Sequence, residues 1–168
     1  MIRQIDFYAI IFCPIKHGDT SVQMNGIAHI GITVSNFKKC NSFYRQLFEF
    51  LEMKLIYDTD EVIYGVGSRT GIVVKEASAE FQNQTFEQNR IGLHHYCFRA
   101  RCKQDIDELH KFLQKIDAVI IHRPEEGSWA RGYYSVLFED PDGIRIEANF
   151  VPGKGNLDPT VTLPREVS

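Results

Sequence analysis

One order of predicted elements occurs twice along the sequence, and this repeat restricts the possible folds more than any other feature. A strand, a helix and three short strands are predicted between residues 25 and 77, and the same order returns between residues 91 and 152. Strands are indicated by β-branched and aromatic residues between turn residues, and helices by apolar residues spaced three and four apart. We therefore predict an α+β fold of two βαβββ modules. Their eight strands would form one curved, incompletely closed sheet around a cleft.

The predicted elements have definite boundaries. The strands cover residues 27–34, 54–58, 62–66 and 71–75 in the first module, and 93–100, 119–122, 133–138 and 143–150 in the second. The helices cover residues 35–52 and 103–116, and Ser35 is the predicted N-cap of the first because its hydroxyl can accept from free helix amides. The run Asp140-Pro141-Asp142-Gly143 predicts a type I turn that joins the last two strands.

Residues 1–24 are interpreted as an extension with one strand at residues 6–13, residues 25–152 as the domain, and residues 153–168 as a tail. The net charge of −3 and the scattered basic residues disfavour nucleic acid and anionic membranes as partners. No apolar run approaches the roughly 20 residues of a membrane span. The four cysteines form no CxxC pair, which favours reduced thiols and a cytoplasmic location.

Two histidines and a glutamate lie on three separate predicted strands. His29 and His95 occupy matching places on the first strand of each module, and Glu147 lies on the last strand. Imidazole and carboxylate are ligands that Zn, Fe, Ni or Mn accept. Because strand side chains alternate between faces, we expect the three side chains to converge on one divalent ion in the cleft.

Glu76 is a candidate fourth ligand, since overlaying the last strands of the two modules pairs it with Glu147. The match is imperfect, because the distance from Gly71 to Glu76 is one residue longer than that from Gly143 to Glu147. An extra residue can turn a side chain to the other face of the strand, so the role of Glu76 stays open. His94 is expected to face away from His95 and to pack or support rather than bind the metal.

At these residues the chain resembles the vicinal oxygen chelate superfamily, which includes glyoxalases, bleomycin-resistance proteins and extradiol dioxygenases. The resemblance covers about residues 25–152. It is carried by the runs Ala28–Val34, Ser42–Tyr44, His94–Arg99 and Phe138–Glu147. It implies paired βαβββ modules around a metal, with ligands on the first and last strand of each module. By that match His29, His95 and Glu147 correspond to ligand positions, and Glu76 lies near the fourth.

The resemblance leaves several activities open. A glyoxalase-like lyase or isomerase would use a metal to chelate two neighbouring oxygens of a small substrate. An open site of two histidines and one carboxylate would also suit an Fe(II) dioxygenase. Fosfomycin-transferring members are disfavoured, because Gly31 stands where they carry a hydroxyl residue. A metal-free protein that binds a drug or metabolite is the alternative from another class.

Substrate-binding candidates are Arg99, on the face predicted for His95, and aromatic residues near two glycines. Trp129, Tyr133 and Tyr134 beside Gly127 and Gly132 are expected to form a rim to the cleft. Glu147 is the expected catalytic carboxylate, with Glu76 as the alternative, because a carboxylate that leaves the ion can move a proton. The resemblance also allows a homodimer, since the superfamily pairs modules within or between chains.

Overall fold

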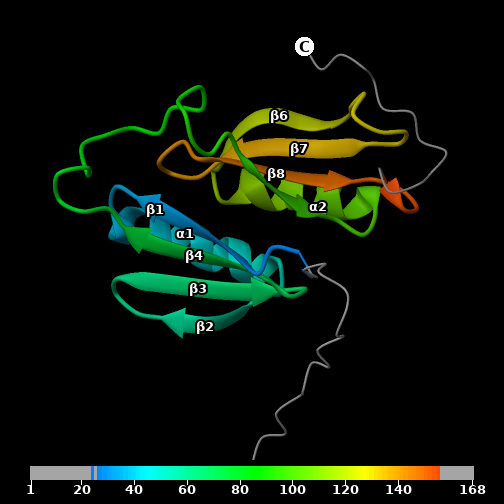
Figure 1. The fold of residues 1–168 in the computed structure, drawn as a ribbon. Coiled ribbons are helices and arrows are strands. Elements are labelled where there is room, and N and C mark those ends of the chain that lie inside the picture. The colour runs from blue at the N-terminus through cyan, green and yellow to red at the C-terminus, as the bar shows by residue number, and fades with distance from the viewer. Residues whose placement is uncertain (1–23, 25, 156–168) are drawn as a thin grey trace, which may run out of the picture.

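The computed structural model describes residue 24 and residues 26–155, and the predicted strand at residues 6–13 lies outside this range. The order βαβββ occurs twice along the described chain (Figure 1). The first module contains β1 (His29–Val34), α1 (Phe37–Phe50), β2 (Lys54–Asp58), β3 (Val62–Gly67) and β4 (Thr70–Glu76). The second contains β5 (Tyr96–Arg99), α2 (Lys103–Lys115), β6 (Val119–Glu126), β7 (Tyr134–Glu139) and β8 (Arg145–Phe150). The predicted α+β fold of two such modules is confirmed.

The strands form two four-stranded sheets rather than one of eight. Their orders are β1-β4-β3-β2 and β5-β8-β7-β6, so each sheet is built within its own module and neither closes on itself. In each module the first strand runs parallel to the last, and the other neighbours are antiparallel. The parallel pairing follows from the helix that separates the first strand from the rest, since parallel neighbours need such a crossover.

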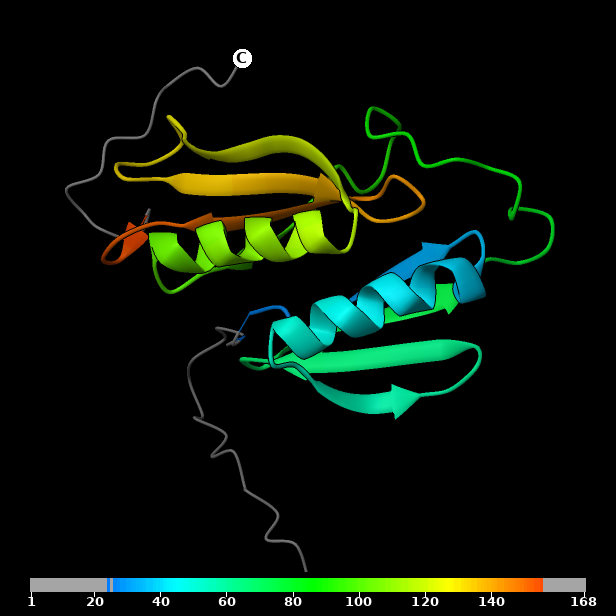
Figure 2. The same ribbon diagram turned by 180° about the vertical axis from the view of Figure 1, so that it is seen from behind.

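Each sheet has one face covered by its helix and one face without a helix, which we call the open face. On β1, Ile32 and Val34 are buried against the helix, whereas His29, Gly31 and Thr33 are exposed on the open face. Both helices lie on the same side of the molecule, behind the sheets in Figure 1 and in front of them in Figure 2. The two open faces therefore lie on the opposite side.

Helix α1 begins at a different cap from the one predicted. The Asn36 side chain accepts from the Lys39 amide at 3.0 Å, so Asn36 is the N-cap. Ser35 is instead bound to the second module: its backbone amide and its hydroxyl both donate to Asp142. The residue that precedes the N-cap of α1 thus forms a contact between the modules.

The two modules share one core. Tyr44 of α1 is fully buried, and its hydroxyl donates to Asp140 Oδ2 at 2.7 Å. The Phe50 and Phe112 rings of the two helices stack with centroids 4.2 Å apart. Asp140 and Asp142 belong to the predicted turn before β8, and Asp140 also accepts from the Ile144 amide at 2.8 Å. The turn therefore fixes β8 to the first module.

Two further findings bear on the sequence predictions. Strand β5 begins at Tyr96, three residues later than predicted, so both His94 and His95 precede it. Among the described helices, neither is long and apolar enough to cross a membrane.

Candidate metal site on the open faces

His95 and Glu147 form a pair on the open face of the second sheet. The His95 Nε2 and Glu147 Oε2 atoms lie 3.2 Å apart. Glu147 faces this way because its neighbours on β8, Ile146 and Ala148, are buried against the helix side. Its side chain keeps 13% of its surface exposed and that of His95 keeps 35%, so both are accessible from solvent.

The pair has the chemistry and spacing of two metal ligands. It offers one imidazole nitrogen and one carboxylate oxygen, a donor set suited to Zn, Fe, Ni or Mn. Two such donors on one zinc ion, each about 2.0–2.2 Å from it, lie roughly 3.0–3.5 Å apart at ordinary bond angles. The observed 3.2 Å falls in this range, so the pair fits a bound divalent ion.

Tyr133 holds the other oxygen of the carboxylate. Its hydroxyl donates a short hydrogen bond to Glu147 Oε1, and only 9% of its surface is exposed. Burial, together with the nearby Glu147 carboxylate, raises the pKa of Tyr133 to about 12, so the phenol is protonated at neutral pH. Glu147 is thus fixed on one side by Tyr133 and faces His95 on the other.

His94 contacts His95 instead of facing away from it. The two Nδ1 atoms lie 2.7 Å apart, and Gln88 of the linker is hydrogen-bonded to the His94 ring. The sequence prediction fails here because the alternation of a strand does not apply before β5 begins at Tyr96. The contact occupies Nδ1 of His95 and leaves Nε2 toward Glu147, as is usual for a metal-binding histidine with a supporting partner.

His29 lies on the open face of the other sheet. Its ring meets the Tyr64 ring edge-on, with centroids 6.4 Å apart. Its register partner on β4 is Gly71, and a side chain there would collide with the Tyr64 ring, since an added Cβ would lie 2.4 Å from it. Within the described residues, no three His, Cys, Asp or Glu side chains come together as a group that could hold a metal. One chain therefore brings together two of the three predicted ligands.

Glu76 lies on the helix-covered side of β4. It shares the parity of Ile72 and Val74, which are buried against the helix, and its carboxylate accepts from the Phe37 amide at 2.8 Å. The strand register identifies the true counterpart of Glu147. Glu147 lies opposite Cys97, two residues after His95, and the residue opposite Gly31, two residues after His29, is Val73.

Val73 therefore takes the position equivalent to Glu147, and Glu76 accepts a hydrogen bond at the start of α1. The site proposed below does not include Glu76. The one additional residue between Gly71 and Glu76, compared with the second module, places the Glu76 side chain on the helix-covered face of β4.

Some of the predicted substrate-binding residues are exposed to solvent, and one lies on the helix-covered side of its sheet. Arg99 is exposed on β5, two residues beyond Cys97, and lies opposite Asn149 of β8. Trp129 is 50% exposed in the loop that leads to Tyr133, so it is available as a rim residue. Tyr134 points to the helix side, where its hydroxyl donates to Asp107 of α2 at 2.8 Å, and it is not part of the rim.

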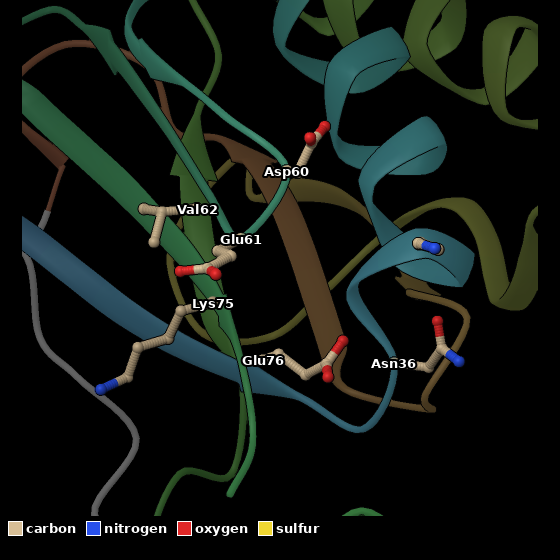
Figure 3. A pocket seen from close by; sticks show the side chains of 7 residues that line it. Asn36, Asp60, Glu61, Val62, Lys75 and Glu76 are labelled. Atoms are coloured by element: carbon tan, nitrogen blue, oxygen red, sulfur yellow. The ribbon is translucent and has the colours of Figure 1, made fainter.

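A cleft of about 520 Å³ beside the start of α1 was not predicted from the sequence. Figure 3 shows Glu76 and Asn36 at its lower edge, with Asp60 and Glu61 above. The cleft contains none of the predicted histidines. It is lined by Asn36, Lys38, Asp60, Glu61, Val62, Lys75 and Glu76.

The fold and the paired side chains define a protein of two βαβββ modules with titratable groups on open sheet faces. The model of the Glyoxalase/Bleomycin resistance protein/Dioxygenase superfamily matches residues 26–148, and the chain belongs to this superfamily.

Individual proteins are similar to this chain in sequence or in fold. The uncharacterised protein YqjT of Bacillus subtilis is 26% identical over 120 residues, which are 71% of this chain and 94% of YqjT. Two solved structures share the fold. A candidate glyoxalase of Bacillus halodurans has a TM-score of 0.66 and 24% identity, over 76% of this chain and 96% of its own. Lactoylglutathione lyase of Agrobacterium tumefaciens has a TM-score of 0.54 and 18% identity, over 76% and 94%.

Proposed function

We propose that this protein is a metal-dependent, glyoxalase-like enzyme of the lyase or isomerase type. Its substrate is a small molecule bound through two neighbouring oxygen atoms. The observation that carries the proposal is the pairing of His95 Nε2 with Glu147 Oε2 at 3.2 Å on an open sheet face. A histidine and a carboxylate so close, with Tyr133 and His94 on their far sides, are arranged as metal ligands with supporting partners.

The third ligand is His29, supplied by a second copy of the chain. His29 lies on the open face of the first sheet, so a two-fold dimer that opposes the open faces of unlike modules would bring it to His95 and Glu147. Exposed apolar and aromatic side chains on the strands β2 and β6 support such an association. They are Ile56, Tyr57, Val119 and Ile121.

When bound, the ion supplies Lewis-acid stabilisation of negative charge on the two substrate oxygens. The side chains do the rest. Glu147 accepts a proton from the substrate carbon and returns it to the neighbouring carbon, so the carboxylate is regenerated. Tyr133 keeps that carboxylate in place, Arg99 attracts an anionic group of the substrate, and Trp129 covers the rim.

The proposal is tested by metal content and by complementation. Protein purified without chelator should contain about one divalent ion per chain, and His29→Ala and Glu147→Ala should each abolish binding. Mixing the two variants after reversible unfolding should restore about a quarter of the sites. At equal amounts, half of the dimers contain one chain of each variant. In each such dimer, one of the two sites combines His29 of one chain with His95 and Glu147 of the other and is intact. Restoration of no sites while the protein is dimeric would refute the shared site.

A dioxygenase is the second candidate, and the position of Val73 favours it. With Val73 in the place equivalent to Glu147, and Glu76 on the helix side, the ligand set is two histidines and one carboxylate. Such a set leaves positions for O₂ on Fe(II). Turnover of a catechol by the iron-loaded protein, without turnover of a 2-oxoaldehyde–thiol adduct, would select this activity.

Binding of a small ligand by protein without metal would instead indicate the binding-protein class. We also propose a cytoplasmic location, because among the described residues Cys40, Cys97 and Cys102 are free thiols.

A further inference from the structure

The Glu147 carboxylate is held at both ends, and the two contacts differ in kind. Oε2 faces His95 Nε2, which is itself a candidate ligand. Oε1 accepts from Tyr133, whose hydroxyl is a neutral donor and a poor ligand for a divalent ion. The hydrogen bond is part-buried, so water competes with it less than at the surface. The tyrosine therefore decides which oxygen of Glu147 is left for the ion.

The loop before β7 is shaped around the Tyr133 ring. The Gly127 amide donates to the Tyr133 carbonyl at 3.1 Å, and a side chain at Gly127 would lie 2.9 Å from the ring. The Tyr133 amide donates back to the Ala130 carbonyl at 3.1 Å. Gly132 adopts a positive φ of 73°, a conformation that favours glycine, and an added Cβ there would meet Pro152 at 2.9 Å. These contacts restrict the position of the Tyr133 ring, which lies beside the Glu147 carboxylate.

We propose that Tyr133 is a positioning residue that fixes the rotation of the Glu147 carboxylate and keeps Oε2 on the His95 side. The sequence predicts Tyr133 at the substrate rim, whereas the hydrogen bond to Glu147 supports a different role. Without the hydroxyl, the carboxylate can rotate and both oxygens exchange with water. Ligands whose supporting hydrogen bond is removed typically bind their metal 10–100-fold more weakly. The effect on affinity rests on the proposed function, whereas the hydrogen bond itself does not.

Tyr134 provides a matched control. It is the next residue in the chain, and its hydroxyl also donates to a carboxylate, that of Asp107 on α2, at 2.8 Å. Its side chain lies on the helix side of the sheet, away from Glu147. Tyr134→Phe therefore removes a similar hydrogen bond without touching the pair.

The first measurement is Zn²⁺ affinity by competition calorimetry, together with the visible spectrum of the Co²⁺-loaded protein. Tyr133→Phe should weaken Zn²⁺ binding about 10–100-fold and alter the Co²⁺ bands, whereas Tyr134→Phe should leave both unchanged. Equal Zn²⁺ affinities for the wild type and Tyr133→Phe would overturn the proposal.

The second measurement needs no metal. In the metal-free protein, thermal unfolding is followed for Tyr133→Phe, Glu147→Ala and the double variant. The tyrosine substitution should lower the midpoint by about 2–4 °C in the wild-type background and by much less once Glu147 is gone. Additive shifts would overturn the proposal even if metal binding is lost for other reasons. A wild type that binds no ion would refute the proposed enzyme, and these shifts alone would then decide the role of Tyr133.

Discussion

Glu147 and Glu76 show how a shift of one residue along a strand moves a side chain from the open face to the helix-covered side. Both lie on the last strand of their module, and counting along the chain pairs them. In the structure Glu147 lies on the open face with His95, and Glu76 lies on the helix side beside Phe37. The sequence placed His95 and Glu147 on facing positions of one sheet, and the structure brings their side chains within 3.2 Å, while their role as metal ligands stays a prediction. The contact between His94 and His95 could not be predicted, because it depends on where β5 begins.

The two neighbouring histidines should differ in their effect on metal binding. His95→Ala removes the Nε2 atom that faces Glu147, and we expect metal occupancy to fall below a tenth of the wild-type value. His94→Ala removes only the contact to Nδ1 of His95, and we expect a loss of about 10-fold in affinity, the lower end of the range for a removed supporting partner. Metal content after dialysis and titration with Zn²⁺ would measure both. Equal and complete loss from the two variants would contradict the assignment of His95 as the ligand.

Helix α1 shows what a local pattern can and cannot predict about an element. The apolar stripe of residues such as Phe37, Tyr44 and Phe48 predicted the helix, and these side chains are buried. The cap was predicted one residue early, at Ser35 instead of Asn36. Ser35 is held by Asp142, which is 107 residues away in the sequence, and no local rule contains such a contact. Distant partners of this kind set the ends of elements.

Glu76 should stabilise this helix without affecting the metal. Glu76→Ala removes the acceptor of the Phe37 amide and a negative charge near the helix N-terminus, so the free energy of unfolding should fall by about 0.5–1.5 kcal/mol. Denaturant titration measures this change, and Zn²⁺ affinity should stay within about twofold of wild type. Glu80→Ala, at an exposed carboxylate of the linker, is the control. A tenfold loss of Zn²⁺ affinity in Glu76→Ala would return Glu76 to the ligand set.

At the scale of the whole molecule, the repeat predicted two modules but not how their sheets relate. A single eight-stranded sheet was expected, and two four-stranded sheets are observed. Repetition within a sequence specifies each module, whereas the contact between modules depends on side chains that the repeat does not share. Tyr44 and Asp140 make such a contact, and both are buried. Burial raises the pKa of Asp140, which makes its hydrogen-bond donors important to the stability of the fold.

Removing the Tyr44 hydroxyl should weaken the join between modules. Tyr44→Phe keeps the ring in the core but deprives Asp140 Oδ2 of its donor, and a buried acceptor without a donor costs about 1–3 kcal/mol. The free energy of unfolding, from denaturant titration, should fall by that amount in one cooperative transition. Glu80→Ala, at the exposed linker carboxylate, should leave it unchanged. An unchanged stability in Tyr44→Phe would contradict the role of this bond.

The turn at Asp140–Gly143 also has a consequence for synthesis of the chain. Its carboxylates bind Ser35 and Tyr44, which precede them by 107 and 96 residues. At about 5–20 residues per second, the ribosome completes the first helix roughly 5–20 s before the turn that must cover it emerges. During that interval the nascent first module exposes the part of its core that the second module later buries. We therefore expect the emerging chain to expose apolar surface that chaperones bind until the last strand arrives.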